Sequence, residues 1–244
     1  MPLVSALPSP ADLWAGLRQG VLLGAAVLAL TLPPAGLASY RPTARLSVVA
    51  SGLVTSPQRP IQVDFGEQPA SVDARRLADW VASARDNARL PFVILDKRDA
   101  RVHVFDAEAR LVDSSPVLLG AAAGDDSVAG IGQRPIAEVR PEERTTPAGR
   151  FISQPGRNSS GEDVVWVDYE AAVSMHRVRP IDPKERRLER LASADPAQRR
   201  ISYGCINVPV AFFEQVIQPL LGRQRAVVYV LPEQKALRAV FAGA

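Results

Sequence analysis

The chain has 244 residues, of which 47% are hydrophobic and 23% charged, with a formal net charge of +3 at pH 7. This is the composition of a globular protein with one good-sized domain and additional segments. The charge is weak and not clustered with aromatic residues, which gives no support to nucleic acid as a partner. A single cysteine, Cys205, excludes an intrachain disulfide and a cysteine-rich zinc site, and with two histidines in the chain we expect no metal centre.

Residues 1–38 have the layout of a targeting segment. Arg18 precedes the uncharged run VLLGAAVLALTL, two prolines end the run, and the small residues AGLAS follow. A run of about 12 apolar residues is short for a membrane span of roughly 20, which favours a secretory signal cleaved after Ala38. An uncleaved membrane anchor and a buried helix of a soluble protein are the alternatives. Signal and anchor both place the remaining chain outside the cytoplasm, in the periplasm or cell envelope, with membrane contact only through this segment.

Residues 39–89 are interpreted as a linker and a lead-in helix. The first part mixes Pro, Gly, Ser and Thr with short apolar pieces. From Ser71 onward, four residues recur at helical spacing: Leu77, Trp80, Val81 and Ala84. Ser71 or Asp73 is expected to cap this helix. We expect a plain amphipathic helix packed on the domain that follows.

Residues 90–232 are expected to form a mainly β domain, followed by a C-terminal tail over 233–244. The segments that read as strands are FVILD, RVHVFD, RLVDSSPVLLG, GRFISQ, VVWVDY, AAVSMHRV, ISYGCINV and RAVVYVLPE. Pro209 is expected in the first turn of a helix, PVAFFEQVIQPLLG, that carries one apolar stripe. The Gly/Pro-rich stretch before GRFISQ is long enough to indicate a functional loop. The charged stretch 182–200 is expected to contain a short helix with a polar outer face.

Cys205 lies in RRISYGCINVP, just ahead of the helix that Pro209 opens. A helix N-terminus and a nearby base both lower the pKa of a thiol and make it nucleophilic. Gly204 allows close backbone approach, and backbone N–H groups at this corner, including that of Cys205, are candidates for an oxyanion hole. The same local residues also fit a structural cysteine at a strand end, so these two interpretations remain open at this point.

A nucleophilic cysteine needs a base, and the chain has two histidines. His103 lies in RVHVF, where no neighbour suggests chemistry, and is expected to be structural or on the surface. His176 ends AAVSMHRV, a strand that we expect beside the cysteine segment, and is the candidate base. No histidine follows Cys205, which excludes the order of papain-type hydrolases.

The segment SYGCIN, residues 202–207, resembles the Ser/Thr-His-Gly-Cys-x-Asn/Arg signature of L,D-transpeptidase (YkuD-type) catalytic domains. FVILDKRDARVHVFD resembles the opening hairpin of that family, ERTTPAGRF its Thr-Pro-x-Gly-x-Phe segment, and VSMHRV its histidine strand. The resemblance covers roughly residues 90–232 and implies an L,D-transpeptidase-like β-sandwich with a few helices. Tyr203 departs from the pattern, since it replaces the second histidine of the signature. The stretch 182–200 also makes the separation between His176 and Ser202 longer than is typical of the family.

The resemblance implies an exported cysteine acyltransferase that acts on peptidoglycan stem peptides and needs no metal or organic cofactor. Its implied catalytic residues are Cys205, His176, Gly204 and Ser202. The acceptor of the acyl group is a second stem, a wall-linked lipoprotein, a free D-amino acid or water, and water would make the protein an L,D-carboxypeptidase or hydrolase. The implied substrate-binding residues are Arg177, Arg200, Tyr203 and Asn207. Either arginine would bind a stem carboxylate or stand solvated on the surface, and Asn207 would brace the loop or cap the helix.

Two other functions fit parts of the sequence. A non-catalytic cell-wall-binding protein with a degenerate transpeptidase fold is suggested by Tyr203 and by the stretch 182–200. A sortase-like protein transpeptidase would use Arg223 or Arg225 as its arginine, but SYGC departs from the Thr-x-Thr-Cys strand of sortases.

Overall fold

The computed structural model of the chain describes residues 61–244, and these belong to one compact unit. The expected signal or anchor segment and most of the expected linker lie outside the described residues. Within residues 61–244, none of the helices combines the length and the apolar character that a membrane span requires.

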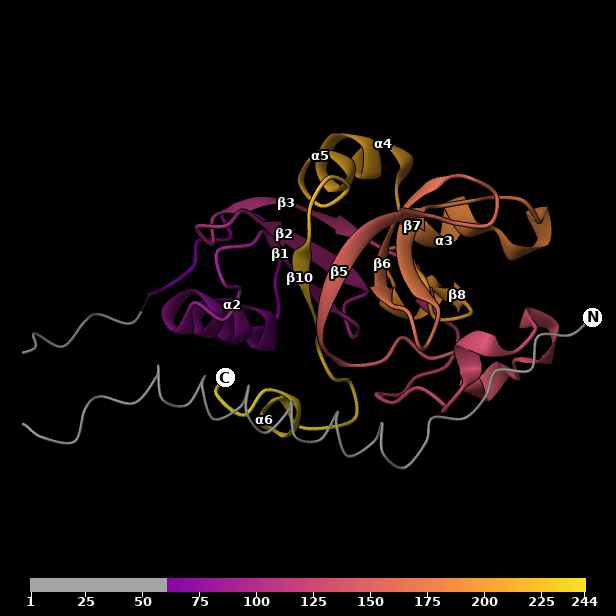
Figure 1. Cartoon of the computed structure of the whole chain (residues 1–244), viewed down its shortest axis with the longest axis horizontal. Helices are drawn as coiled ribbons and strands as arrows, with labels where there is room; N and C mark the ends of the chain where they lie inside the picture. The colour runs from indigo at the N-terminus through magenta and orange to yellow at the C-terminus, as the bar shows by residue number, and fades with distance from the viewer. Residues whose placement is uncertain (1–60) are drawn as a thin grey trace, which may run out of the picture. The chain divides into compact units, whose positions relative to one another are not determined.

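The described residues are mainly β, as the sequence predicts (Figure 1). The strands are β1 (Phe92–Asp96), β2 (Arg101–Phe105), β3 (Leu111–Pro116), β4 (Leu119–Gly120), β5 (Gly149–Arg157), β6 (Asp163–Asp168), β7 (Val173–Arg177), β8 (Arg200–Ser202), β9 (Ile206–Val208) and β10 (Ala226–Val230). The α-helices are α2 (Val72–Ala84), α3 (Arg187–Ala192), α4 (Val210–Phe212), α5 (Gln218–Leu220) and α6 (Leu237–Val240). Short 3₁₀ turns interrupt the long loop between β4 and β5 and flank α3.

Eight strands form one sheet in the order β3-β2-β1-β10-β5-β6-β7-β9, and β4 and β8 form a small second sheet. The pairs β1–β10, β7–β9 and β4–β8 are parallel, whereas the other pairs are antiparallel. Leu118, between β3 and β4, exchanges two backbone hydrogen bonds of 2.9 Å with Asn207 of β9. This bridge brings the two ends of the large sheet together. The β layers expected as a sandwich are therefore parts of one near-closed sheet.

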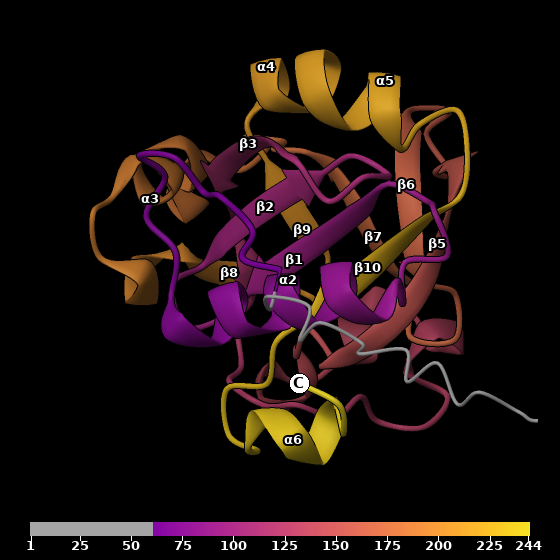
Figure 2. The ribbon, with the colours of Figure 1, turned by 90° about the vertical axis from the view of Figure 1, so that its left-hand side faces the viewer.

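Two hydrophobic clusters fill the two faces of this sheet. Along β1, Val93 and Leu95 join one cluster and Phe92 and Ile94 join the other, because successive strand residues point to opposite faces. The first cluster is covered by the α4–α5 segment, and the second by α2 and α6 (Figure 2). All residues of β1 and β10 are buried, which explains why both strands read as unbroken apolar runs.

Helix α2 has the expected amphipathic form and the expected cap. The Ser71 hydroxyl accepts a hydrogen bond of 3.0 Å from the N–H of Ala74, and Leu77 and Val81 are fully buried. Phe65, ahead of the helix, is buried in the same cluster. The C-terminal residues, expected as a tail, instead contain α6, which buries Leu237 against this cluster. The chain on both sides of residues 90–232 therefore contributes to the hydrophobic core.

The helix expected after Pro209 is a continuous helical segment with a change of pitch. Pro209 is its N-cap, and a π-helical stretch, Phe213–Ile217, separates α4 from α5. Pro219 has no N–H to donate to the carbonyl of Gln215, and the π-helical stretch lies just before it.

Candidate active site

The sequence around Cys205 forms a loop held between two sheets. Upstream of the loop, β8 pairs with β4, and Gly120 is the partner of Ser202. Downstream, β9 pairs in parallel with β7, and His176 is the partner of Asn207. The histidine strand and the cysteine segment are therefore neighbours, as the sequence predicts. The pairing places the imidazole on β7 and the thiol in the loop residue that immediately precedes β9.

The backbone of the loop requires glycine at position 204. Gly204 has a φ of +127°, and a Cβ atom added there would lie 2.7 Å from the carbonyl oxygen of Thr145. The Ser202 hydroxyl accepts a hydrogen bond from the Gly204 N–H (3.1 Å) and donates one to the Cys205 carbonyl (2.6 Å). The Asn207 amide donates to the same carbonyl at 3.2 Å. Ser202, Gly204 and Asn207, all singled out in the sequence, thus take part in the hydrogen bonds that fix the Gly204 N–H and the Cys205 carbonyl.

The Cys205 side chain is half-buried, with polar groups around its sulfur. The Sγ atom lies 3.7 Å from the Ser174 hydroxyl and 3.6 Å from the Ala172 carbonyl. Burial raises the pKa of the thiol, but His176 and Ser174 together outweigh it and hold the pKa below that of an ordinary cysteine. The site therefore stabilises the thiolate, the nucleophilic form, more than water does.

A hydrogen bond to the backbone of the next residue determines the tautomer of His176. Its Nδ1 lies 2.7 Å from the carbonyl oxygen of Arg177, and a carbonyl can only accept a hydrogen bond. Nδ1 must therefore carry a proton in the neutral ring, which leaves Nε2 unprotonated and able to accept the proton of the thiol. His176 is thus in the tautomer that a general base requires.

The thiol and the imidazole open into a cleft of about 320 Å³. The cleft is lined by Ile136, His176, Arg179, Ile181, Asp182, Glu185, Arg187, Ser202, Tyr203, Cys205 and Asn207. Ile136 comes from the long loop between β4 and β5, and residues 179–187 come from the segment that follows β7. Both stretches that stood out in the sequence therefore form walls of the cleft. The two arginines in this lining, Arg179 and Arg187, were not among the expected site residues.

Arg177 and Arg200, which the sequence suggested as carboxylate-binding residues, do not line the cleft. Arg177 points to the opposite face of β7 from His176, where its guanidinium lies 4.3 Å from the Phe213 ring and 3.2 Å from Glu214. Arg200 forms an ion pair with Glu233 and is only 16% exposed, so it is not a solvated surface residue either. The expectation failed because position beside the motif in sequence does not fix the side of the backbone on which a side chain lies.

The other expected site residues line the cleft, except Gly204, which lies between two lining residues of the loop, Tyr203 and Cys205. Tyr203 is partly exposed, and the guanidinium of Arg144 lies 4.0 Å from its ring centroid. Arg187 pairs with Glu185 and donates a hydrogen bond of 2.7 Å to the Asn207 side-chain oxygen. The charged stretch 182–200 therefore contacts the motif directly. The long separation of His176 and Ser202 in sequence drew attention to this stretch. It did not indicate which of its side chains point into the cleft.

His103 of β2 is fully buried and does not line the cleft. Its Nδ1 lies 2.7 Å from the Ser114 hydroxyl, and its ring packs edge-on against Phe65. Burial lowers the pKa of His103 to about 4, so the ring is neutral near pH 7. This agrees with the structural role expected for it. Among residues 61–244, no three His, Cys, Asp or Glu side chains gather closely enough to hold a metal ion.

No family model matches the chain, and no curated protein sequence matches it. Among solved structures, an L,D-transpeptidase from Xylanimonas cellulosilytica matches with 16% identity and a TM-score of 0.37, over 58% of this chain and 60% of that one. The helical cell shape determining protein Pgp2 from Campylobacter jejuni matches with 15% identity and a TM-score of 0.41, over 64% of this chain and 55% of that one. L,D-transpeptidase 1 from Mycobacterium tuberculosis matches with 15% identity and a TM-score of 0.33, over 58% of this chain and 61% of that one. This chain thus spans less than two thirds of each solved chain. Two of these three similar structures are L,D-transpeptidases, the family whose motifs the sequence resembles.

Proposed function

We propose that the protein is an exported cysteine acyltransferase that acts on peptidoglycan stem peptides by L,D-transpeptidation. The observation that carries this proposal is the pairing of Cys205 with His176 in an open cleft, where the histidine lowers the pKa of the thiol against the effect of burial. A structural cysteine would have no use for a base beside it. The motif resemblance supplies the substrate class.

The reaction begins with transfer of the thiol proton to Nε2 of His176. The thiolate attacks the carbonyl carbon of the L-centre residue in a tetrapeptide stem and forms a carbon–sulfur bond. We assign the Cys205 N–H to the resulting oxyanion, because the Gly204 N–H is already bound to the Ser202 hydroxyl. Collapse of this intermediate breaks the amide bond, and the terminal D-alanine leaves with the proton from His176. The product is a thioester on Cys205.

The second half-reaction returns the enzyme to its starting state. An amine of a second stem or of a wall-linked lipoprotein attacks the thioester, loses a proton to His176 and forms a new amide bond as the thiolate leaves. Water in place of the amine releases a free carboxylic acid, which is carboxypeptidase or hydrolase activity. His176 serves as base and then as acid in each half-reaction.

Arg179 takes the substrate-binding role that the sequence suggested for Arg177 and Arg200. It lines the cleft, and its only ion-pair partner among residues 61–244 is Glu162 at 3.2 Å, with both side chains partly exposed. An exposed pair of this kind contributes little stability, so a stem carboxylate can replace Glu162 as the partner of the guanidinium.

The test is incubation of the purified full chain with a disaccharide-tetrapeptide, followed by mass analysis of the products. Cross-linked dimers indicate transpeptidation, and a tripeptide alone indicates hydrolysis. A β-lactam that acylates thiols should add its mass to the wild-type protein, add nothing to Cys205→Ala, and react slowly with His176→Ala. Folded protein that takes no label and changes no muropeptide would contradict the proposal and favour a wall-binding protein. Cleavage of a sorting peptide without action on muropeptides would favour a sortase-like activity.

A further inference from the structure

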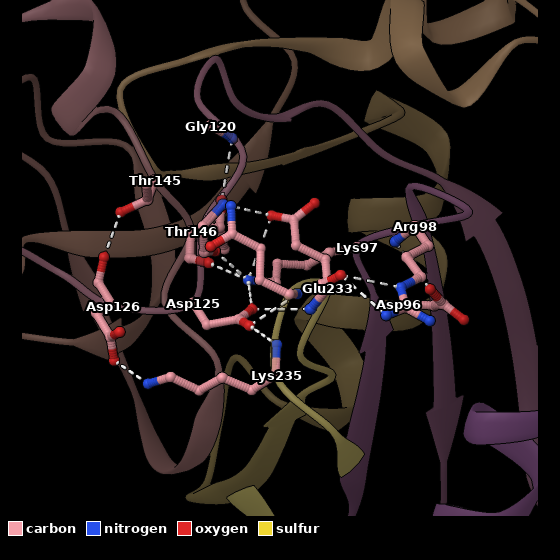
Figure 3. A network of polar contacts seen from close by, with 12 residues as sticks. Asp96, Lys97, Arg98, Gly120, Asp125, Asp126, Thr145, Thr146, Glu233 and Lys235 are labelled. Atoms are coloured by element: carbon pink, nitrogen blue, oxygen red, sulfur yellow. Dashed lines mark hydrogen bonds and ion pairs between the residues drawn. The ribbon is translucent and has the colours of Figure 1, made fainter. Parts of the chain in front are cut away.

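Four charged side chains lie together beneath the nucleophile loop. Lys97 follows β1, Asp125 lies in the loop after β4, Arg200 opens β8, and Glu233 follows β10. Their side chains are 0%, 1%, 16% and 9% exposed, respectively. Two cations balance two anions, so we call this group the buried charge quartet; Figure 3 shows its members Lys97, Asp125 and Glu233 from close by.

The buried charge quartet joins segments that are far apart in the chain. Lys97 Nζ donates to Asp125 (2.8 Å) and to the Thr146 carbonyl (3.0 Å), and it lies 3.5 Å from Glu233. Asp125 also accepts the backbone N–H groups of Glu233, Gln234 and Lys235, at 2.7 to 2.9 Å. Burial raises the pKa of Asp125, but the hydrogen bonds from Lys97 and these N–H groups lower it far more. The carboxylate therefore stays ionised and holds the long loop against the chain that follows β10.

The first connection from the quartet to the nucleophile runs through Thr146. Its carbonyl accepts a hydrogen bond from Lys97. Its hydroxyl donates a hydrogen bond of 2.9 Å to the Gly204 carbonyl and accepts one of 3.0 Å from the Gly120 N–H. The neighbouring Thr145 carbonyl leaves no room for a Cβ atom on Gly204. A shift of this segment would therefore displace the peptide bond that precedes Cys205.

The second connection runs through β8. Arg200 pairs with Glu233 and donates a hydrogen bond of 2.8 Å to the Lys97 carbonyl, which fixes the start of the strand. The strand ends at Ser202, whose hydroxyl binds the Gly204 N–H and the Cys205 carbonyl. The two connections thus reach the peptide groups on both sides of Gly204.

Stability alone gives a weak reason for four charges in this position. Removing ions from water is costly, and apolar side chains of similar volume are often as stable or more stable in such places. Geometry gives a stronger reason, because a misplacement of about 1 Å at a catalytic group can lower a rate about 100-fold. Salt bridges and charge-assisted hydrogen bonds also restrict direction in a way that apolar contacts do not.

We propose that the buried charge quartet is the positioning device of the nucleophile, holding the Gly204–Cys205 segment in register with His176. This inference rests on the proposed role of Cys205. Lys97, Asp125, Arg200 and Glu233 do not line the cleft, so they are positioning residues rather than catalytic ones.

The experiment measures the rate of Cys205 alkylation by iodoacetamide against pH, together with Tm, for the full chain. Glu233→Gln removes one anion of the quartet, and Thr146→Val removes only the hydroxyl that holds Gly204. Both should slow alkylation about tenfold near pH 7 and move the midpoint of the pH profile upward, because the thiol loses its alignment with His176. The double variant Lys97→Met/Glu233→Gln removes one cation and one anion. It should have a higher Tm than Glu233→Gln but should not restore the wild-type pH profile of alkylation.

Asp86→Asn is the matched control. Asp86 pairs with Arg150 at 2.6 Å and with the buried Tyr229 hydroxyl at 2.5 Å, away from the cleft. It should lower Tm and leave the profile of Cys205 unchanged. The positioning role would be overturned if Glu233→Gln and Thr146→Val both lowered Tm but kept the wild-type pH profile of Cys205 alkylation. If Glu233→Gln does not fold, the result for Thr146→Val alone decides. A wild-type midpoint at the ordinary value for cysteine, about 8.5, would overturn the proposed function and this inference with it.

Discussion

Arg187 fixes the orientation of the Asn207 side chain. Its guanidinium, which can only donate, binds Asn207 Oδ1 at 2.7 Å, so the amide nitrogen must face the other way, toward the Cys205 carbonyl at 3.2 Å. The charged stretch 182–200 therefore does more than lengthen the connection between β7 and β8. It contributes the group that orients the side-chain amide of Asn207, the last residue of the SYGCIN motif, toward Cys205.

Arg187→Ala should lower the rate of Cys205 acylation about tenfold and the free energy of unfolding by about 2 kcal/mol, because Asn207 and Glu185 lose a buried partner. The neighbouring Arg186 is the control. Its only ion pair among residues 61–244, with Glu189, is exposed, so Arg186→Ala should change stability by less than about 0.5 kcal/mol. Acylation kinetics and denaturant unfolding test both variants. Equal behaviour of the two would show that the contact with Asn207 has no role in the site.

The thiolate of Cys205 should persist to lower pH than that of a free cysteine. A lowered pKa means that alkylation rises with pH and reaches its plateau below the ordinary midpoint of about 8.5. In His176→Ala the contributions of His176 that lower the pKa are lost, so the midpoint should move upward relative to the wild type. Single-turnover acylation by a stem peptide should likewise fall on acidification as the thiolate is protonated. A rate that does not change with pH would contradict a reaction that depends on the Cys205 thiolate.

Gly204→Ala should abolish acylation and destabilise the fold by about 3 kcal/mol, because it adds both backbone strain and a clash with the Thr145 carbonyl. Gly161→Ala separates these effects. Gly161 also has a positive φ, +79°, but a Cβ atom there meets nothing within 4 Å. This control should cost about 1 kcal/mol from strain alone and keep full acylation. Unfolding curves measure the loss of stability, and β-lactam labelling measures the rate of acylation. A Gly204→Ala variant labelled at the wild-type rate would show that acylation does not need the close approach of Gly204 to Thr145.

Arg179→Ala should raise KM for a stem peptide about tenfold with little change in kcat, because a bound carboxylate loses its partner in the ground state and transition state alike. Arg177→Ala should leave KM unchanged, since that guanidinium packs on Phe213 outside the cleft. Steady-state kinetics with tetrapeptide distinguish the two positions. The reverse result would return the carboxylate to Arg177, as the sequence first suggested.

The strands could be predicted because the burial of each strand is reflected in the apolar residues of that strand itself. β1 and β10 are buried on both faces and consist of apolar residues except for Asp96 at the end of β1, and Ser71 marks the start of α2. The proximity of the Cys205 and His176 segments was also predictable, since His176 lies on a strand, Cys205 directly precedes one, and strands close in sequence often pair. These features depend on neighbours in sequence or on one simple pairing.

The partners of the charged side chains could not be predicted in this way. Lys97 reads as part of a polar turn, yet it is fully buried because Asp125, 28 residues later, turns toward it. Arg200 lies two residues before the motif, but its partner Glu233 follows 33 residues later. Which side of the backbone these long side chains take depends on the assembled fold. A single sequence contains no periodic pattern that records it.

The bridge between Leu118 and Asn207 also bears on when the thiol becomes reactive. It joins a segment ahead of the long loop to the strand that follows the nucleophile, and Glu233 comes still later in the chain. Contacts of such large sequence separation form slowly and late. A newly synthesised or unfolded chain lacks these contacts. If Cys205 has the proposed role, its sulfur gains the environment of the cleft only after nearly all of the described residues have folded.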